Sequence, residues 1–537
     1  MDKKENPTMD VKNICIIGAG PAGLGALKVI KEYPEYKKGL WKAVAFEARE
    51  AIGGIWCVTS LSIFYPMLNL SRVPAPPTGN PPLTALYDSL TTNTATPLMA
   101  YPDFPFPPST PLFPSAPVVL EYLRSYAAHF DLNKHIRLRT TVRSVDWDAG
   151  LSKWRVRWNA TDAGPDASTE RGLFDLIAVA NGHYTHPHFP DTPGLHAWRD
   201  AGKASHSAWY RHPRNLGDTI LIVGGGPSGV DIADEMRAVS RTIVHSTPGA
   251  QRVDLEGGAF KRRARVVEFL DVHEGRVRFE DGTTESGIDH CILATGFEHY
   301  LPFLPPSLVS KTLPTSVPPL PTTLHNSRFH LFPVARQVFP LTSAFPPSRL
   351  TFLVLPYRVI PFRFIEPQMR AVLAVFADPA RLDVAHEADL LVKRYEAFKA
   401  QGLDDLAIAH AWHKFPPETC EQFDYIDDLL DFVGGAYGEP QAKVPQWVRE
   451  FWLMNQVLRA EWRELEKSGE AEAWAAGVGD AEGEDEKWQQ WQELMRRVIR
   501  RAEKRQTSED KEKLTSGEGL PSGVLLEAAA SYAQLPN

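Results

Sequence analysis

The chain has 537 residues, of which 43% are hydrophobic and 23% charged, and a net charge of −8. This length predicts two or three domains, and the negative charge excludes the electrostatic footprint of a nucleic-acid-binding protein. The four cysteines (Cys15, Cys57, Cys291 and Cys420) form no CxxC pair, which favours a reducing compartment. The sequence shows neither a signal peptide nor an apolar run long enough to span a membrane, so we expect a cytosolic protein.

Strands and helices alternate through the first part of the chain. The hydrophobic pattern predicts a strand, a glycine turn and a helix over 11–33, and then a proline-dense irregular region over about 73–117. Further elements are expected as follows: strands over 43–48, 142–148, 153–159 and 173–182, and a helix over 119–130.

The same strand–turn–helix pattern begins again near Asp218. It predicts strands over 219–226, 241–246 and 287–297, with a helix over 228–239. We expect a helical stretch from about Glu366 to Ala400 and a helix over 487–505. From about Gln506 the charged tail is predicted to be disordered.

The first glycine turn, IIGAGPAGLGAL, matches the GxGxxG pattern with Gly18, Gly20 and Gly23. The glycines allow a tight turn, a close approach of the backbone to a pyrophosphate, and packing of helix on strand. Glu47 ends the next strand and is predicted to accept a hydrogen bond from a ribose hydroxyl. An exposed strand-end glutamate is the alternative interpretation.

The second turn, IVGGGPSGVDIA, repeats the pattern with Gly224, Gly226 and Gly229. No acid ends the strand that follows it, and an acid there would repel a 2′-phosphate. His245, Ser246 and Arg252 could instead bind such a phosphate, which favours NADPH over NADH. Two such turns predict one site for FAD and one for NADPH.

Several motifs together resemble the flavin-containing monooxygenase family over roughly residues 10–435. EAREAIGGIW (47–56) is similar to the family's acid-then-GGxW segment beside FAD, and CILATGF (291–297) resembles its ATG strand. LPYRVIPFRFIEPQ (355–368) resembles a strand-to-helix segment nearer the C-terminus. These motifs are strong evidence because they occur in the family's order and spacing.

The family signature FxGxxxHxxxY has a counterpart in DAGKASHSAWY. Gly202, His206 and Tyr210 are in register, but Asp200 stands where phenylalanine is usual, and Trp198 could supply the missing aromatic contact. Tyr210 favours this family over the related Baeyer–Villiger enzymes, which usually have tryptophan there. On the residues alone, His206 could equally be a surface histidine in a linker.

The irregular stretch LYDSLTTNTATPLMAYPDFPFP (86–107) resembles the family segment that contains the active-site asparagine, here Asn93. A neutral amide offers both donors and an acceptor to the flavin and to peroxide. On composition alone, a turn asparagine bonded to its own backbone would be the better interpretation. The resemblance therefore predicts Asn93 as the catalytic residue.

The resemblance implies an α/β fold with two Rossmann-like domains, the NADPH domain being inserted into a discontinuous FAD domain. We expect the FAD domain over 10–215 and 298–455, the NADPH domain over 216–297, and a charged helical extension with a disordered tail over 456–537. The predicted cofactor-binding residues are Gly18, Ala19, Gly20, Pro21, Ala22, Gly23, Glu47, Gly54, Ile55, Trp56, Thr92, Asn93, Thr94, His206, Tyr210, Gly224, Gly226, Ser228, Gly229, Val230 and Asp231.

The implied reaction uses NADPH to reduce FAD, forms a flavin 4a-hydroperoxide with dioxygen, and transfers oxygen to an amine nitrogen or thioether sulfur of a small molecule. A Baeyer–Villiger oxidation of a ketone and a non-catalytic flavoprotein are alternatives. A disulfide reductase is disfavoured because it needs a cysteine pair near the flavin. His183, His186 and His188 lie close in sequence but fit no metal-ligand spacing, so no metal is predicted.

The helix over 487–505 has Trp488, Trp491, Met495 and Val498 on one face and arginines on the other. A helix of this kind packs on the enzyme body or lies on an anionic membrane surface. We expect the packed arrangement. The oligomeric state cannot be derived from these patterns.

Overall fold

The computed structural model describes residues 11–57, 84–164, 168–314, 316–434 and 442–516. By its internal contacts the chain divides into two compact units. Unit 1 consists of Met1–Gly54, Thr91–Gly182 and Leu301–Asn537, and unit 2 consists of Ile55–Leu90 and His183–Tyr300. Each unit therefore contains segments that are distant in sequence. In the described part of the chain, no helix is both long and apolar enough to span a membrane.

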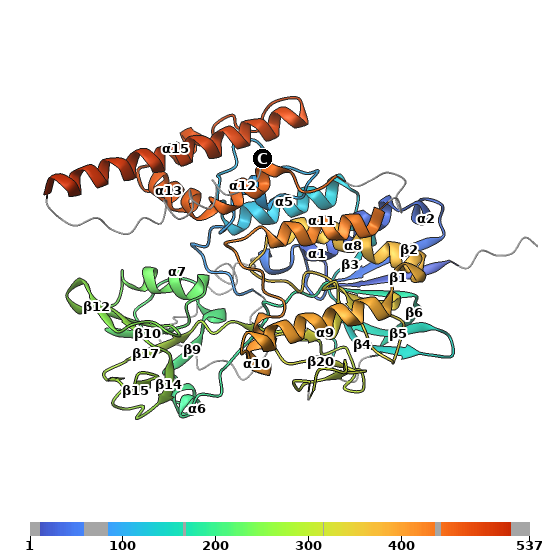
Figure 1. The fold of residues 1–537 in the computed structure, drawn as a ribbon, viewed down its shortest axis with the longest axis horizontal. Helices are drawn as coiled ribbons and strands as arrows, with labels where there is room; N and C mark the ends of the chain where they lie inside the picture. Colours follow the sequence, from blue (N-terminus) through green and yellow to red (C-terminus); the bar gives the residue numbers. More distant parts are fainter. Residues whose placement is uncertain (1–10, 58–83, 165–167, 315, 435–441, 517–537) are drawn as a thin grey trace, which may run out of the picture. The chain divides into compact units, whose positions relative to one another are not determined.

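Unit 1 is built on a five-stranded parallel sheet with the order β24–β7–β1–β2–β3, of which Figure 1 labels β1, β2 and β3. The central strands β1 and β7 are almost wholly buried, as parallel sheets covered on both faces require. The bounds are β1 Lys12–Ile17, β2 Trp41–Phe46, β3 Ile136–Arg137, β7 Leu176–Val179 and β24 Leu350–Phe352. The strand predicted at the start of 11–33 and the strands predicted over 43–48 and 173–182 are thus confirmed.

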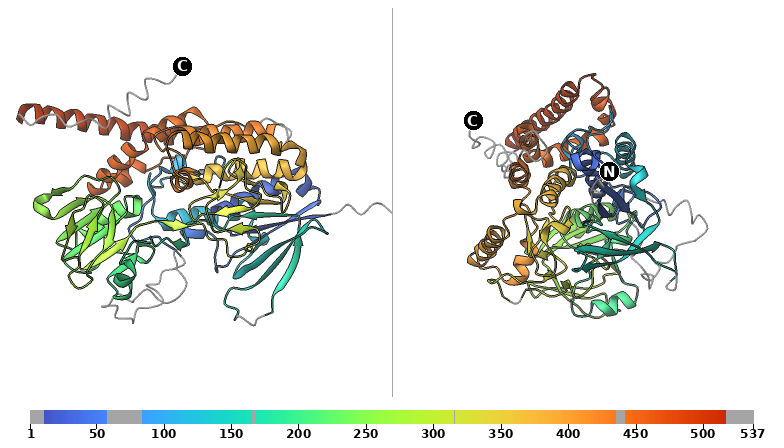
Figure 2. Two further views of the ribbon diagram at one scale, coloured as in Figure 1. Left: turned by 60° about the horizontal axis from the view of Figure 1, so that its bottom comes forward. Right: turned by 90° about the vertical axis from the view of Figure 1, so that its right-hand side faces the viewer.

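Helix α1 (Pro21–Glu32) follows β1 and packs on α8 (Pro361–Ala377). The two helices approach closely at Gly25, where a Cβ atom would lie 2.5 Å from the side chain of Ile365. An antiparallel sheet of β4 (Thr140–Asp148), β5 (Lys153–Ala160) and β6 (Glu170–Phe174) also belongs to unit 1. In both views of Figure 2 this sheet, in teal, lies on the opposite side of the unit from the orange helices near residue 400.

Unit 2 contains a six-stranded sheet with the order β12–β13–β11–β10–β17–β9. Only the edge strand β12 is antiparallel, so the sheet is again of the doubly wound type. The bounds are β9 Ala204–His206, β10 Thr219–Val223, α7 Pro227–Met236, β11 Thr242–Ser246, β12 Val253–Leu255, β13 Phe260–Arg263 and β17 His290–Leu293. The predicted fold class, with two Rossmann-like sheets, is confirmed.

The C-terminal part of unit 1 is helical, but its helices differ from the prediction. The stretch expected over 366–400 is two helices, α8 and α9 (Val384–Ala400), because the chain turns at Asp378–Pro379, where proline follows an extended residue. Asp383 then caps α9 by accepting a hydrogen bond from His386 N.

Helices α11 to α15 complete the unit: α11 Glu421–Val433, α12 Gln446–Leu453, α13 Asn455–Lys467, α14 Ala471–Ala475 and α15 Glu484–Ser516. The prediction of disorder from Gln506 is wrong as far as Ser516, since α15 continues to that residue. Residues 517–537 of the predicted tail and residues 73–83 of the proline-dense region lie outside the described residues.

Candidate active site

The first glycine turn has a backbone shape that only glycine adopts readily. Gly18 has φ +107°, and a Cβ atom there would lie 2.5 Å from the carbonyl oxygen of Ala180 at the end of β7. A Cβ atom on Gly23 would lie 2.0 Å from the oxygen of Gly18. Both glycines are therefore required by the contacts that the turn makes within the protein.

The GGxW segment packs directly against this turn. Gly53 N donates to Ala19 O at 3.0 Å, and a Cβ atom on Gly20 would lie 3.2 Å from Cα of Gly54. Gly54 begins the short helix η1 (Gly54–Trp56), in which Ile55 and Trp56 are partly exposed. The GGxW segment and the first glycine turn, both predicted to lie beside FAD, thus contact each other through their backbones.

The N-terminus of α1 is suited to an anion. Gly20 is its N-cap and makes no side-chain capping bond, Pro21 starts the helix, and the first turn contains no acid. The first N–H groups of a helix have no partner within it, and the helix dipole adds partial positive charge. This uncapped end, with Ala22 beside it, fits the pyrophosphate of a dinucleotide.

Glu47 lies at the same turn and is only 6% exposed. Its Oε2 accepts a hydrogen bond from Ala19 N at 2.8 Å, and its Oε1 accepts one from Arg49 N at 2.9 Å. The alternative of an exposed glutamate is wrong. Each carboxylate oxygen keeps a further lone pair, so the group can still accept a hydrogen bond from a ribose.

The loop around Asn93 is held by hydrogen bonds on several sides. Thr92 and Thr94 are 3% and 6% exposed; Thr92 Oγ1 donates to Thr94 O at 3.0 Å and Thr94 Oγ1 to Asn93 Oδ1 at 3.3 Å. Thr92 N also donates to Pro114 O at 2.9 Å. An irregular segment is thereby fixed without belonging to a helix or sheet.

Asn93 itself is exposed, in contrast to its neighbours. Its side chain makes no hydrogen bond with its own backbone in the described structure, so it is not a self-bonded turn asparagine. The Nδ2 group has no protein partner among the described residues. The loop thus presents an amide whose two N–H donors are available to a ligand.

A residue that the sequence did not single out supports this loop. Asn455, the first residue of α13, is 4% exposed and donates from Nδ2 to Asn93 O at 2.7 Å. Its Oδ1 accepts a hydrogen bond from Ala95 N at 3.1 Å. Nothing in the sequence marks it, since the two partners are separated by 362 positions.

The second glycine turn repeats the geometry of the first within unit 2. Gly224 has φ +122°, and its Cβ atom would lie 2.3 Å from Ala294 O, while that of Gly229 would lie 2.0 Å from Gly224 O. Gly226, the N-cap of α7, differs because nothing lies within 4 Å of its Cβ position. Ser228 and Val230 follow in the first turns of α7, which lacks a side-chain cap and an acid in its first turn.

The open space at Gly226 gives a prediction. Gly226→Ala adds a methyl group where the protein offers no obstacle, and its φ of −74° is allowed for alanine. We expect unchanged thermal stability and FAD content, but a KM for NADPH raised about tenfold, because the methyl group occupies the space for a phosphate. Steady-state kinetics and a melting curve check this, and an unchanged KM would contradict it.

The prediction for the end of β11 needs a correction. Ser246 is 1% exposed; its hydroxyl donates to Ala264 O at 2.8 Å and accepts from Val266 N at 3.1 Å. It is therefore not available to bind a 2′-phosphate, because its hydroxyl is buried and bonded to the backbone of the neighbouring segment. His245 is partly exposed and bonds Gly224 O at 2.9 Å, and Arg252 is exposed.

His206 joins two of the recognised motifs. It is 1% exposed, its Nδ1 accepts from Ala208 N at 3.0 Å, and its Nε2 therefore donates to Gly296 O of the ATG segment at 3.0 Å. Burial lowers its pKa to about 3, so the ring is neutral. The alternative of a surface histidine is wrong.

Tyr210 anchors the helix that follows the second turn. Its hydroxyl donates to Glu235 Oε2 at 2.5 Å, and Tyr87 donates to Asp231 Oδ2 at 2.6 Å. Both carboxylates lie on α7, and the two tyrosine rings meet edge to face. The segment around Tyr87 and the signature residue Tyr210 thus hold α7 from one side.

The buried histidines of unit 2 predict a loss of stability in acid. Burial lowers the pKa of His290, which is 3% exposed, to about 4 from an ordinary value of 6.5. Below pH 6.5 the unfolded chain takes up a proton that the folded chain does not, so this contribution is complete above pH 6.5 and is lost as the pH falls toward 4. At pH 5 the cost is about 2 kcal/mol for His290, and His206 adds a similar cost.

The measurement is the melting temperature at pH 7 and pH 5 for the parent chain and His290→Asn. We expect a smaller decrease in the variant, which has no titrating ring at this position. An equal decrease in both proteins would show that His290 does not titrate on unfolding.

The amphipathic helix at the C-terminus packs within unit 1. Trp491, Leu494, Met495 and Val498 of α15 are at most 1% exposed and share one buried cluster with Trp462 of α13. The apolar face that membrane binding would use is therefore covered, as expected.

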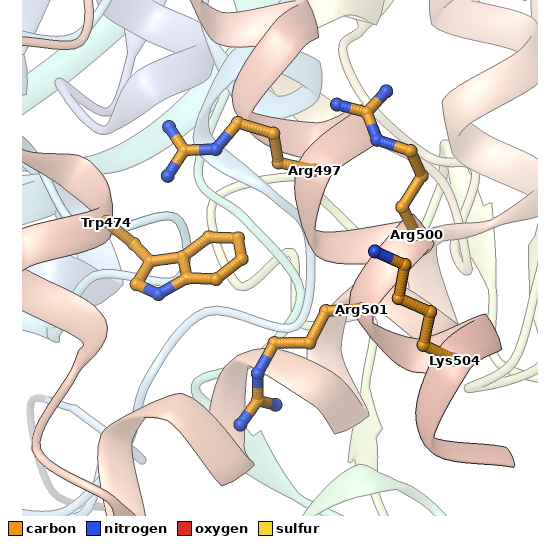
Figure 3. Close-up of a pocket in the computed structure, with 5 residues that line it drawn as sticks. All are labelled: Trp474, Arg497, Arg500, Arg501 and Lys504. Carbon is orange, nitrogen blue, oxygen red and sulfur yellow. The ribbon is translucent and has the colours of Figure 1, made fainter. Parts of the chain in front are cut away.

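A pocket of about 340 Å³ lies on the other face of α15 (Figure 3). Arg497 lies over the ring of Trp474 in this pocket, and Arg501 and Arg505 pair with the buried Glu461. No residue of either glycine turn lines it; the lining residues are Trp474, Arg497, Arg500, Arg501 and Lys504. The pocket is therefore separate from the two candidate dinucleotide sites.

Comparison with known proteins gives a family match that spans both glycine turns. A family model described as FMO-like, flavin-binding monooxygenase-like, matches residues 11–254. The flavin-containing monooxygenase FMO GS-OX-like 7 of Arabidopsis thaliana is 30% identical over 435 residues, which are 76% of this chain and 84% of that protein. The chain belongs to the flavin-containing monooxygenase family. This monooxygenase is therefore an oxidoreductase whose cofactors are FAD and NADPH.

Two further proteins are similar to this monooxygenase. The thiol-specific monooxygenase of Saccharomyces cerevisiae is 29% identical over 377 residues, covering 68% of this chain and 77% of that protein. The solved structure of S-allyl-L-cysteine S-oxygenase from Allium sativum superposes with a TM-score of 0.65 at 23% identity, over 91% of this chain and 99% of that one. The second similarity confirms the fold.

Proposed function

We propose that this monooxygenase uses NADPH and dioxygen to oxygenate a soft nucleophile, a thioether sulfur or an amine nitrogen, in a small molecule. The observation that carries the proposal is the exposed amide of Asn93 on a loop whose neighbouring side chains are buried. The thiol-specific relative from yeast is named for a sulfur substrate, which supports sulfur as the atom that is oxygenated.

Residues of unit 1 are assigned to FAD. The uncapped N-terminus of α1, which begins after Gly20, binds the pyrophosphate. Glu47 accepts a hydrogen bond from the ribose with a lone pair that Ala19 N does not use. Asn93 donates a hydrogen bond from Nδ2 to the flavin or to the oxygen species bound there. Because the amide is neutral, it orients that group without transferring a proton to it.

Residues of unit 2 are assigned to NADPH. The N-terminus of α7 binds its phosphates in the open space at Gly226, and His245 and Arg252 face the 2′-phosphate. His206 and Tyr210 act as positioning residues in this scheme, because their polar atoms are bonded to Gly296 and Glu235. When bound, FAD supplies the oxygen-activating chemistry and NADPH the hydride.

Isotope labelling tests the proposal. The FAD-loaded protein is incubated with NADPH, ¹⁸O₂ and a methyl thioether, a tertiary amine or a cyclic ketone. The masses of the products are measured by mass spectrometry. We expect one ¹⁸O atom in the sulfoxide or N-oxide. Conversion of the ketone alone to a lactone would replace this proposal by a Baeyer–Villiger function, and a lack of NADPH oxidation would favour a non-catalytic flavoprotein.

A further inference from the structure

The C-terminal helices take part in building the Asn93 loop. Ala95 and Leu98 next to the loop are fully buried and belong to the same apolar cluster as Trp462 of α13 and Trp491 of α15. The only polar side chain that joins α13 to residues 93–95 in the described structure is Asn455. Asn455 therefore lies where the helical part meets the loop that bears the candidate catalytic amide.

The orientation of the Asn455 amide is fixed by its partners. A backbone N–H can only donate, so Ala95 N requires the amide oxygen, and a carbonyl can only accept, so Asn93 O requires the amide nitrogen. Reversing the amide would break both bonds. The two bonds hold the backbone on either side of Thr94.

We propose that Asn455 is a positioning residue that holds the backbone of Asn93, so that the Asn93 amide keeps NADPH oxidation coupled to oxygen transfer. This inference rests on the function proposed for Asn93. Asn455 does not reach the substrate, because both of its polar groups are bonded to the loop and its side chain is buried. Its effect comes from limiting the movement of the loop.

The test uses the full-length, FAD-loaded protein. Asn455→Asp keeps the shape and the acceptor for Ala95 N but replaces the donor to Asn93 O with an oxygen, and Asn455→Ala removes both bonds. We expect the fraction of consumed NADPH that appears as hydrogen peroxide to rise about fivefold, within the range for loss of one hydrogen bond. The rate of flavin reduction by NADPH should change much less, because Asn455 bonds only the backbone of the loop and neither glycine turn.

Another buried amide of unit 1 serves as the control. Gln422 of α11 is 1% exposed, and its Oε1 accepts from Ile360 N at 2.9 Å, away from the Asn93 loop. Gln422→Ala should lower the melting temperature to a similar extent without raising peroxide release. Equal peroxide release from Gln422→Ala and Asn455→Ala would show a general effect of destabilisation and overturn the inference.

Asn93→Ala and the double variant Asn93→Ala/Asn455→Asp separate the inference from the function on which it rests. If Asn455 acts through Asn93, the double variant releases no more peroxide than Asn93→Ala alone. If Asn93→Ala releases peroxide but Asn455→Asp does not, the inference is overturned and the role of Asn93 stands. If neither variant releases peroxide, the role proposed for Asn93 fails and the inference fails with it.

Discussion

Gly18→Val is expected to give a protein without bound FAD and with a much lower melting temperature. A residue with a Cβ atom at φ +107° costs about 1–3 kcal/mol in backbone strain alone. The Cβ atom would also lie 2.5 Å from Ala180 O and 3.0 Å from Ala180 C, which are backbone atoms of a buried strand end and cannot rotate away. The turn must therefore move, and the N-terminus of α1 moves with it.

The measurement is the ratio of flavin absorbance to protein absorbance after purification, together with a melting curve. Gly39→Ala is the matched control, because Gly39 has φ +75° in the same unit but nothing within 4 Å of its Cβ position. It should keep its flavin. A yellow Gly18→Val protein with the parent's flavin content would show that the turn tolerates the displacement.

Asn93→Ala is expected to retain FAD and to oxidise NADPH, but to release most of the reducing equivalents as hydrogen peroxide. The substitution removes the Nδ2 donors of Asn93 and the oxygen that accepts the hydrogen bond of Thr94 Oγ1. The loop stays anchored, because the hydrogen bond from Asn455 to residue 93 is made to the backbone oxygen and not to the side chain. We expect product formation to fall about a hundredfold, as when one preorganised donor is lost from an active site.

Parallel assays of peroxide, NADPH and oxygenated product measure this effect. Asn133→Ala is the control, since Asn133 is also an exposed asparagine of unit 1 but lies outside the loop. Product formation by Asn93→Ala equal to that of the parent would contradict the catalytic role of Asn93.

Features that depend on local sequence could be predicted. The two glycine turns were found because buried strands precede Gly18 and Gly224 and amphipathic helices follow them, and both contexts are present in the structure. The contact of Gly18 with β7 could not be predicted in this way: a side chain at Gly18 would meet the backbone of Ala180, which is 162 positions away.

Features that depend on contacts between distant segments could not be predicted. Asn455 is one asparagine in a charged helical region, and only the folded chain brings it to residues 93 and 95. The residue type of Ser246 suits a phosphate site, but the backbone of Ala264 and Val266 covers and bonds its hydroxyl, and these residues follow a different strand. Pro379 marks the break between α8 and α9, but the hydrophobic pattern continues on both sides of it and therefore suggests one helix.

The division of unit 1 into separate segments affects the order in which the chain becomes functional during synthesis. The ribosome completes every residue of unit 2 by Tyr300, whereas the sheet of unit 1 still lacks the edge strand β24 at that point. Asn455 emerges about a hundred residues after β24. A nascent chain can therefore fold unit 2 before the sheet of unit 1 has its last strand. The contact that we propose to position Asn93 is therefore the last of these features to be made, and a chain that stops between β24 and Asn455 would have the strands of both sheets but not this contact.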